Sequence, residues 1–127
     1  MPMPSPTPTN TYQSTTTRTR QQLAEAVLKD ALAVIGQDET PQQAETENVG
    51  RMYDDALEYM RDEGVADWDS DAIPASVFRS VVQVVASDAA IAWGAPYDPQ
   101  NKAMGMAQLR RSIAKKASDR PTQIEAF

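Results

Sequence analysis

One segment of the chain, residues 75–93, is apolar almost all the way round a helix. A narrow polar strip interrupts it, at Ser76, Arg79, Ser80, Gln83 and Ser87. Its apolar positions are Val77, Phe78, Val81, Val82, Val84, Val85, Ala89, Ile91, Ala92 and Trp93. A helix with so little polar surface is buried on nearly every side. In a chain of 127 residues, it is therefore either the central helix of one compact domain or a helix that contacts neighbouring subunits.

The valines of this segment would also suit a β-strand, but its length and its ends favour a helix. Asp71 suits an N-cap region, Ile73 can hold the chain entry by a hydrophobic contact, and Pro74 suits a first helical turn. Gly94 predicts the end of the helix directly after Trp93.

Three further helices are predicted from helical spacing of apolar residues and from capping signals. The first covers residues 18–35, and Gly36 is expected to cap its C-terminus. The second begins at Thr40-Pro41 and closes at Gly64. The fourth follows an Asp98 N-cap and runs to about residue 117, with a weak apolar face that Gly105 loosens. The sequence thus predicts an all-α fold, a small four-helix bundle-like domain over residues 18–117.

Extended arms flank this domain. Residues 1–17 carry prolines at every second position from Pro2 to Pro8 and are rich in threonine, which favours extended or polyproline backbone. Residues 118–127, SDRPTQIEAF, include Pro121, which keeps Arg120 out of a helix, and two apolar side chains, Ile124 and Phe127. We expect this tail to be a docking peptide that becomes ordered on a partner.

The amino-acid composition excludes several kinds of catalytic and metal-binding site. The chain has no cysteine and no histidine, so disulfides, thiol nucleophiles, histidine bases and typical zinc clusters are excluded. Asp67, Asp69 and Asp71 have the spacing of a calcium loop, but the glycine and glutamate that such a loop needs are replaced by Ala72 and Phe78. We expect no catalytic residue, no metal site and no cofactor. We also expect a soluble protein, because no signal peptide or membrane-spanning run is apparent.

Two pairs of adjacent carboxylates are the remaining candidates for acid and base catalysts. The two pairs are Asp54-Asp55 and Asp62-Glu63, which lie on the polar side of the second helix. Adjacent helical positions diverge by about 100°, and solvated carboxylates make poor general acids. A small carboxylate enzyme is therefore the weakest of the functional hypotheses.

Charge is distributed unevenly along the chain, which has a net charge of −6. Residues 24–75 hold fourteen acidic side chains against Lys29, Arg51 and Arg61. Residues 76–127 hold seven basic side chains against four acidic ones. Copies of the chain could therefore pack acidic flank on basic flank, although both flanks could equally be ordinary solvated faces.

The strongest electrostatic feature is the set of basic residues near the C-terminus. The set comprises Lys102, Arg110, Arg111, Lys115, Lys116 and Arg120. It could bind nucleic acid, but the acidic pI and the lack of interleaved aromatic residues favour docking on an acidic protein surface. Candidate partner-binding residues are Arg110, Arg111, Lys115, Lys116, Arg120, Pro121, Thr122, Gln123, Ile124 and Phe127.

Four features in sequence order resemble the head-to-tail adaptor proteins of tailed bacteriophages, also called head-completion or tail accessory factors. They are the helix RTRQQLAEAVLKDALAVIG, the helix YDDALEYMRDEG, a loop that contains Trp68 and ends in Ile73-Pro74, and AAIAWGAPYD at the end of an alanine- and valine-rich helix. The tail PTQIEAF resembles the proline-started, aromatic-ended tails of some members. Phe127 departs from their commoner tyrosine-phenylalanine ending, and residues 1–17 have no counterpart.

The resemblance implies a non-enzymatic virion protein at the head-tail junction, assembled from subunits in the host cytoplasm. It implies a homo-oligomeric ring, expected to be a dodecamer, that binds the portal protein and the tail or nozzle proteins. Genomic DNA would pass through without sequence-specific contact, and no membrane is involved. Trp68, Ile73, Pro74, Phe78 and Trp93 are the expected structural or interface residues. The alternative is a phage DNA-packaging or DNA-binding assembly protein whose basic C-terminal helix meets phosphate.

Overall fold

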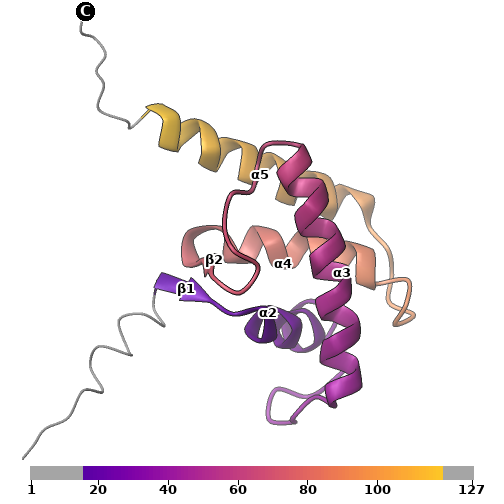
Figure 1. Ribbon diagram of the computed structural model, residues 1–127. Helices are drawn as coiled ribbons and strands as arrows, with labels where there is room; N and C mark the ends of the chain where they lie inside the picture. Colours follow the sequence, from indigo (N-terminus) through magenta and orange to yellow (C-terminus); the bar gives the residue numbers. More distant parts are fainter. Residues whose placement is uncertain (1–15, 119–127) are drawn as a thin grey trace, which may run out of the picture.

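The computed structural model describes residues 16–118 and confirms the all-α class. Its elements are β1 (Thr17–Arg18), α2 (Arg20–Ala26), the π-helix η1 (Val27–Ala31), α3 (Gln43–Asp62), β2 (Ile73–Pro74), α4 (Ala75–Ala89) and α5 (Pro99–Ser118) (Figure 1). With η1 counted as the continuation of α2, four helices are present in this part of the chain. The sequence did not predict the short sheet, in which β1 and β2 pair antiparallel.

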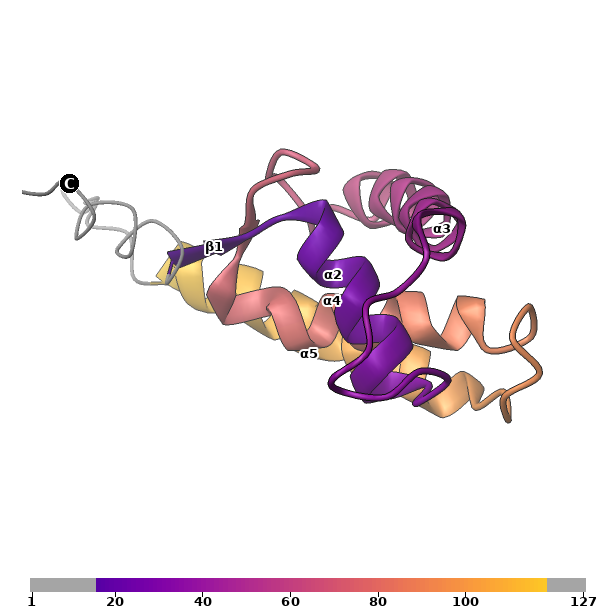
Figure 2. The ribbon, with the colours of Figure 1, turned by 90° about the horizontal axis from the view of Figure 1, so that it is seen from below.

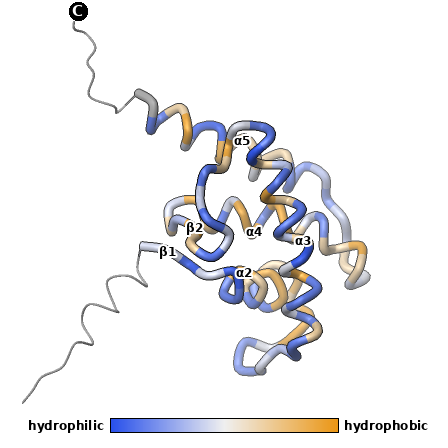
Figure 3. Tube along the Cα trace, viewed as in Figure 1, coloured by the Kyte–Doolittle hydropathy of each residue, from blue (hydrophilic) through white to orange (hydrophobic). Residues whose placement is uncertain are grey.

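The most apolar helix, α4, is the central helix of the fold. It contacts α2, η1, α3 and α5, and Figure 3 shows its hydrophobic stretch in the middle of the molecule. Val81, Val84 and Val85 are completely buried. Elements of the same chain therefore cover most of α4, so its apolar character does not by itself require a neighbouring subunit.

Gly105 brings α5 close to α4. A Cβ atom at this position would lie 2.9 Å from the carbonyl oxygen of Ser80 and 2.9 Å from Cγ2 of Val84. Nearby, Met106 and Leu109 of α5 are buried in the core. The sequence prediction that Gly105 loosens the helix was therefore incomplete, because the missing side chain is what lets the two backbones approach.

The first helix differs most from its prediction. It begins at Arg20, two residues late, because the Thr19 hydroxyl accepts a hydrogen bond from the Gln22 amide and the Gln22 side chain accepts one from the Thr19 amide. It then continues as a π-helix and ends near Leu32. Ala33, at φ 54°, takes the left-handed conformation expected of Gly36.

The π-helix explains which residues of this first helix are buried. Leu23, Ala24, Val27 and Leu28 all lie in the core, as the predicted apolar face requires. A π-turn contains an extra residue, which rotates the following positions away from that face. Ala31 and Val34 are consequently exposed, contrary to the prediction, whereas Leu32 and Ile35 are half-buried against the core.

The second predicted helix, α3, has the expected end and apolar face but a later start. Gly64, at φ 76°, follows the helix directly after its C-cap, Glu63. At the other end, the Glu45 carboxylate accepts a hydrogen bond from the Gln42 amide at 2.9 Å, which places the N-cap at Gln42 rather than at Thr40. The buried residues are Thr46, Val49, Gly50, Tyr53, Ala56, Leu57 and Met60.

Asp71 caps a different helix from the one predicted. Its carboxylate accepts a hydrogen bond from the Arg20 amide at 2.9 Å, in the first turn of α2. Ile73, which pairs with Arg18 in the sheet, is completely buried, and Pro74 is the N-cap of α4. The loop before α4 is thus fastened to the start of α2 rather than to α4 itself.

The turn between α4 and α5 begins earlier than predicted. Regular α-helix ends at Ala89, and the chain continues through hydrogen-bonded turns to Gly94, at φ 68°. Trp93 therefore lies in this turn and not in the helix. The predicted start of α5 is confirmed, because Asp98 accepts a hydrogen bond from the Gln100 amide at 3.0 Å and Pro99 is the first helical residue.

Candidate interaction surface

The basic residues of α5 are partly neutralised within the chain. Arg110 contacts Glu63, the C-cap of α3, at 3.2 Å, and Lys116 lies 3.8 Å from Asp67 in the loop that follows. Both contacts join the acidic first half of the chain to its basic second half. The opposite charges of the two halves are therefore satisfied in part by the fold itself, which weakens the argument that they require a second copy.

Lys102 is also occupied within the chain. Its Nζ lies 2.9 Å from a carboxylate oxygen of Asp88 on α4 and 5.4 Å from the centre of the Tyr59 ring. This lysine therefore joins α5 to both α4 and α3.

Two basic side chains of α5 remain available. Arg111 and Lys115 are exposed, and within residues 16–118 neither contacts an acidic side chain at ion-pair distance. They lie four residues apart and hence on one face of the helix. This outward pair is the part of the predicted basic set that the fold leaves free to meet a partner.

An apolar pocket of about 280 Å³ lies beside the last two turns of α5. Its apolar lining is Val65, Trp68, Pro74, Val77, Leu109 and Ile113. Its polar rim is Asp67, Ser76, Ser112, Lys115 and Lys116. We call it the α5 end pocket. In Figures 1 and 2 the end of α5 and the β1–β2 pair lie toward the same end of the molecule.

Trp68 is fixed at this pocket by two polar contacts. Its indole Nε1 donates to the Tyr53 hydroxyl at 3.2 Å, and its carbonyl oxygen accepts from Arg61 at 2.6 Å. The Tyr53 hydroxyl in turn donates to the Ser70 carbonyl at 2.9 Å. Burial raises the pKa of Tyr53 above its usual value, so the hydroxyl stays protonated and can donate.

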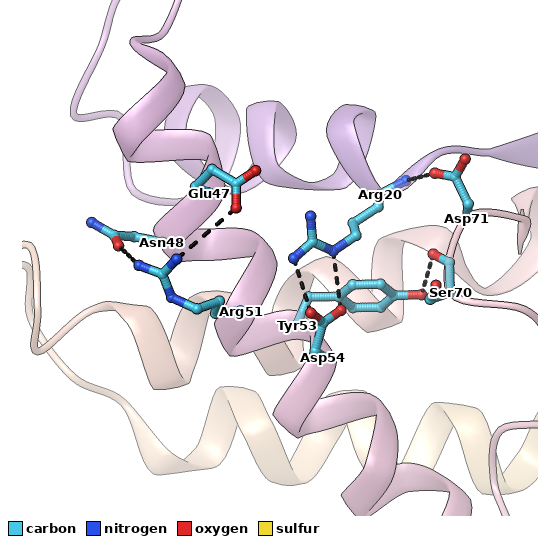
Figure 4. A network of polar contacts seen from close by, with 8 residues as sticks. All are labelled: Arg20, Glu47, Asn48, Arg51, Tyr53, Asp54, Ser70 and Asp71. Atoms are coloured by element: carbon cyan, nitrogen blue, oxygen red, sulfur yellow. Dashed lines mark hydrogen bonds and ion pairs between the residues drawn. The ribbon is translucent and has the colours of Figure 1, made fainter.

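A second set of polar contacts, beside Tyr53, joins α2 to α3 (Figure 4). Both carboxylate oxygens of Asp54 accept hydrogen bonds from Arg20, from Nε at 3.0 Å and from Nη2 at 2.9 Å. Nearer the start of α3, Arg51 contacts Glu47, one helical turn away, at 3.9 Å, and also the side chain of Asn48. No local spacing in the sequence indicates the contact between α2 and α3.

The two remaining aromatic candidates lie on other faces. Phe78 is half-buried and lines a shallow groove with Asp30, Ala31, Arg79, Val82 and Gln83. Trp93 is half-buried beside Ala92 and contributes to a hollow with residues of α3. Of the five predicted structural residues, the structure therefore brings only Trp68 and Pro74 to the α5 end pocket.

Several predicted partner-binding residues cannot be placed. Arg120, Pro121, Thr122, Gln123, Ile124 and Phe127 lie outside the described residues, as does the arm over residues 1–15. The chain enters this tail directly after Ser118, two residues beyond the rim of the α5 end pocket.

Across residues 16–118, no cluster of three or more acidic side chains is arranged to hold a metal ion. Of the paired carboxylates, Asp54 bonds Arg20 and Glu63 bonds Arg110. None of the helices in that range is both long and apolar enough to cross a membrane.

No family model, curated protein or solved structure matches this chain. The resemblance to head-to-tail adaptors therefore rests on the order of its motifs, and it remains a prediction.

Sequence reasoning missed the α5 end pocket and the bond between Tyr53 and Trp68. The sequence does offer an indication of this hydrogen bond, because buried tyrosine and tryptophan side chains usually require polar partners.

Proposed function

We propose that this chain is a structural subunit of a phage head-to-tail adaptor, which forms a ring and binds the portal through its C-terminal segment. The observation that carries the proposal is the outward pair Arg111 and Lys115, at the end of α5 that leads into residues 119–127. A basic helix end next to a proline-containing segment with two apolar anchors suits docking onto an acidic protein surface.

The ring part of the proposal rests on the motif order and on the need for two unlike lateral faces, because head-to-tail contacts close into rings. One face offers Arg111 and Lys115. The other is the exposed side of α3, whose acidic residues Asp55, Glu58 and Asp62 bond no basic side chain in the described part of the chain. These two charged surfaces remain after the internal ion pairs are accounted for.

The second candidate is a phage DNA-binding or packaging protein, and the same outward pair favours it. Two free basic side chains supply little of the phosphate neutralisation that duplex binding needs, and the net charge of −6 opposes it. A DNA-binding protein should show tight duplex binding with a steep dependence on salt. The adaptor should show weak binding even at low salt.

Deleting residues 121–127 tests the proposed docking. The helical domain should stay folded, as judged by circular dichroism, while attachment to the portal ring encoded in the same genome is lost. A full-length variant with I124A and F127A should behave like the deletion, whereas the matched variant T122A/Q123A should still attach. Retained attachment of the deletion would refute the docking role.

A further inference from the structure

We propose that the α5 end pocket holds the chain's own C-terminal segment, residues 124–127, when the subunit is free. Ile124 and Phe127 occupy its apolar floor and Glu125 lies at Lys115. The occupant is the same polypeptide chain, not a second copy. This inference does not depend on the adaptor role, since it concerns the isolated subunit.

The pocket has the size and lining for a short peptide segment. Its volume of about 280 Å³ lies just below the range of roughly 300–1,000 Å³ that is usual for small-molecule sites. The floor is formed by the largely buried side chains of Val65, Trp68, Val77 and Leu109, and Ile113 is half-buried beside them. Two apolar side chains three residues apart can cover such a floor without bringing a polar group into it.

The charge at the rim favours an acidic residue in the occupant. Asp67 and Lys116 face one another at 3.8 Å and so offset each other. Lys115 contacts no acidic side chain within residues 16–118, which leaves the rim with one unbalanced positive charge. The segment Ile124-Glu125-Ala126-Phe127 carries one negative charge between its apolar residues. The Glu125 side chain and the unbalanced Lys115 are therefore opposite in charge.

The chain can reach the pocket from its own helix end. Ile124 lies six positions after Ser118, and an extended chain over six positions spans up to about 20 Å. The rim and floor residues of α5 run from Leu109 to Lys116, a rise of about 10 Å in an α-helix. Pro121 suits the second position of a reverse turn, which would direct the following residues back along α5.

The spacing of the two anchors matches this stretch of helix. In a polyproline-type backbone, with three residues per turn, Ile124 and Phe127 fall on one side and are separated by about 9 Å. A segment running antiparallel to α5 then places Ile124 near Lys116 and Phe127 near Leu109. Because the segment is joined to α5 by a short stretch of chain, its effective concentration at the pocket is high. A modest affinity is therefore sufficient for occupancy.

Disulfide trapping tests the proposal directly, because the natural chain has no cysteine. The full-length variant S112C/A126C keeps both anchors and both charges, and Ser112 lies on the pocket rim. Mild oxidation of a dilute sample should give an intramolecular disulfide in most molecules, seen by mass spectrometry and non-reducing gels. The matched control R111C/A126C, whose first cysteine is one position away and does not line the pocket, should form at least several-fold less.

Each other result overturns the proposal. Disulfide-linked dimers as the main product would make a second copy the occupant. Equal trapping in the control would indicate that the tail cysteine reacts without seating in the pocket. Absence of trapping in both variants would leave the pocket to another occupant, such as residues 1–15.

A charge swap provides the second measurement. In the S112C/A126C background, K115E should lower the yield of the intramolecular disulfide by about two- to fivefold, the effect of one exposed ion pair. Adding E125K should restore it. If the yield does not depend on these charges, Glu125 does not lie at Lys115. Failure of portal attachment would leave all of these results intact, because no partner is present.

Discussion

Arg20 and Asp54 join α2 to α3 through two parallel hydrogen bonds of 3.0 and 2.9 Å. The guanidinium lies directly over Gly50, one turn earlier on α3. A Cβ atom on Gly50 would be 2.6 Å from Cζ of Arg20. A glycine in the middle of a 20-residue helix therefore creates the space that lets this arginine reach its carboxylate.

The substitution Gly50→Ala should depend on Arg20. Alanine favours a helix interior by about 1 kcal/mol over glycine, but here its methyl group displaces the guanidinium from Asp54. We expect little or no net stabilisation in the natural chain and about 1 kcal/mol of stabilisation in an R20A background. Urea unfolding of the four proteins in this cycle measures the difference, and equal effects in both backgrounds would contradict the proposed contact.

Gly105→Ala should destabilise the fold although it improves helix propensity. Its Cβ would lie 2.9 Å from the Ser80 carbonyl oxygen, a backbone atom that cannot move without shifting α4. Overpacking of this kind costs about 1–3 kcal/mol. Gly36→Ala is the matched control, since its Cβ would meet only the Glu39 side chain at ordinary distances. A stable Gly105→Ala protein would show that α4 and α5 are farther apart.

Tyr53→Phe should cost about 1–3 kcal/mol in the free energy of unfolding, because it removes partners from buried groups. Trp68 Nε1 would lose its acceptor and the Ser70 carbonyl its donor. Tyr59→Phe is the control, because Tyr59 is exposed. Chemical denaturation of both variants measures the effect, and similar small losses would argue against the buried hydrogen bonds.

Alkaline pH should weaken the fold through the same tyrosine. Burial raises the pKa of Tyr53 in the folded state above its unfolded value, so the folded state holds the proton more tightly. The resulting stability is complete below about pH 10, the unfolded value, and is lost as the pH rises through the higher folded pKa. Unfolding free energies measured across this range should fall less steeply for Tyr53→Phe. Parallel pH profiles would assign the loss to other groups.

The sequence predicted the features that depend on local pattern. The apolar stripe of α3 and the Asp98-Pro99 start of α5 follow from periodicity and capping chemistry. The extensive burial of α4 follows from its composition, although the sequence left open whether this chain or a neighbouring subunit covers it. Each of these is determined by residues within a few turns of one another. These features can therefore be predicted from the sequence without knowledge of the fold.

The remaining features depend on contacts between distant residues. Asp71 caps α2 instead of α4 because β1 pairs with β2, which no local spacing reveals. The π-helix after Ala26 and the close approach at Gly105 are decided by packing against α4. For the candidate surface, the basic residues were predicted, but the pairing of Arg110 with Glu63 and the pocket beside α5 required the fold.

The adaptor role is tested most directly by counting the copies that join a portal ring. The full chain, mixed with the portal ring encoded in the same genome, should add mass in a single cooperative step in native mass spectrometry. The added mass should equal twelve copies of the 13.9 kDa subunit, and the deletion of residues 121–127 should add none. A portal ring that gains no mass, while the chain remains a monomer, would contradict the account.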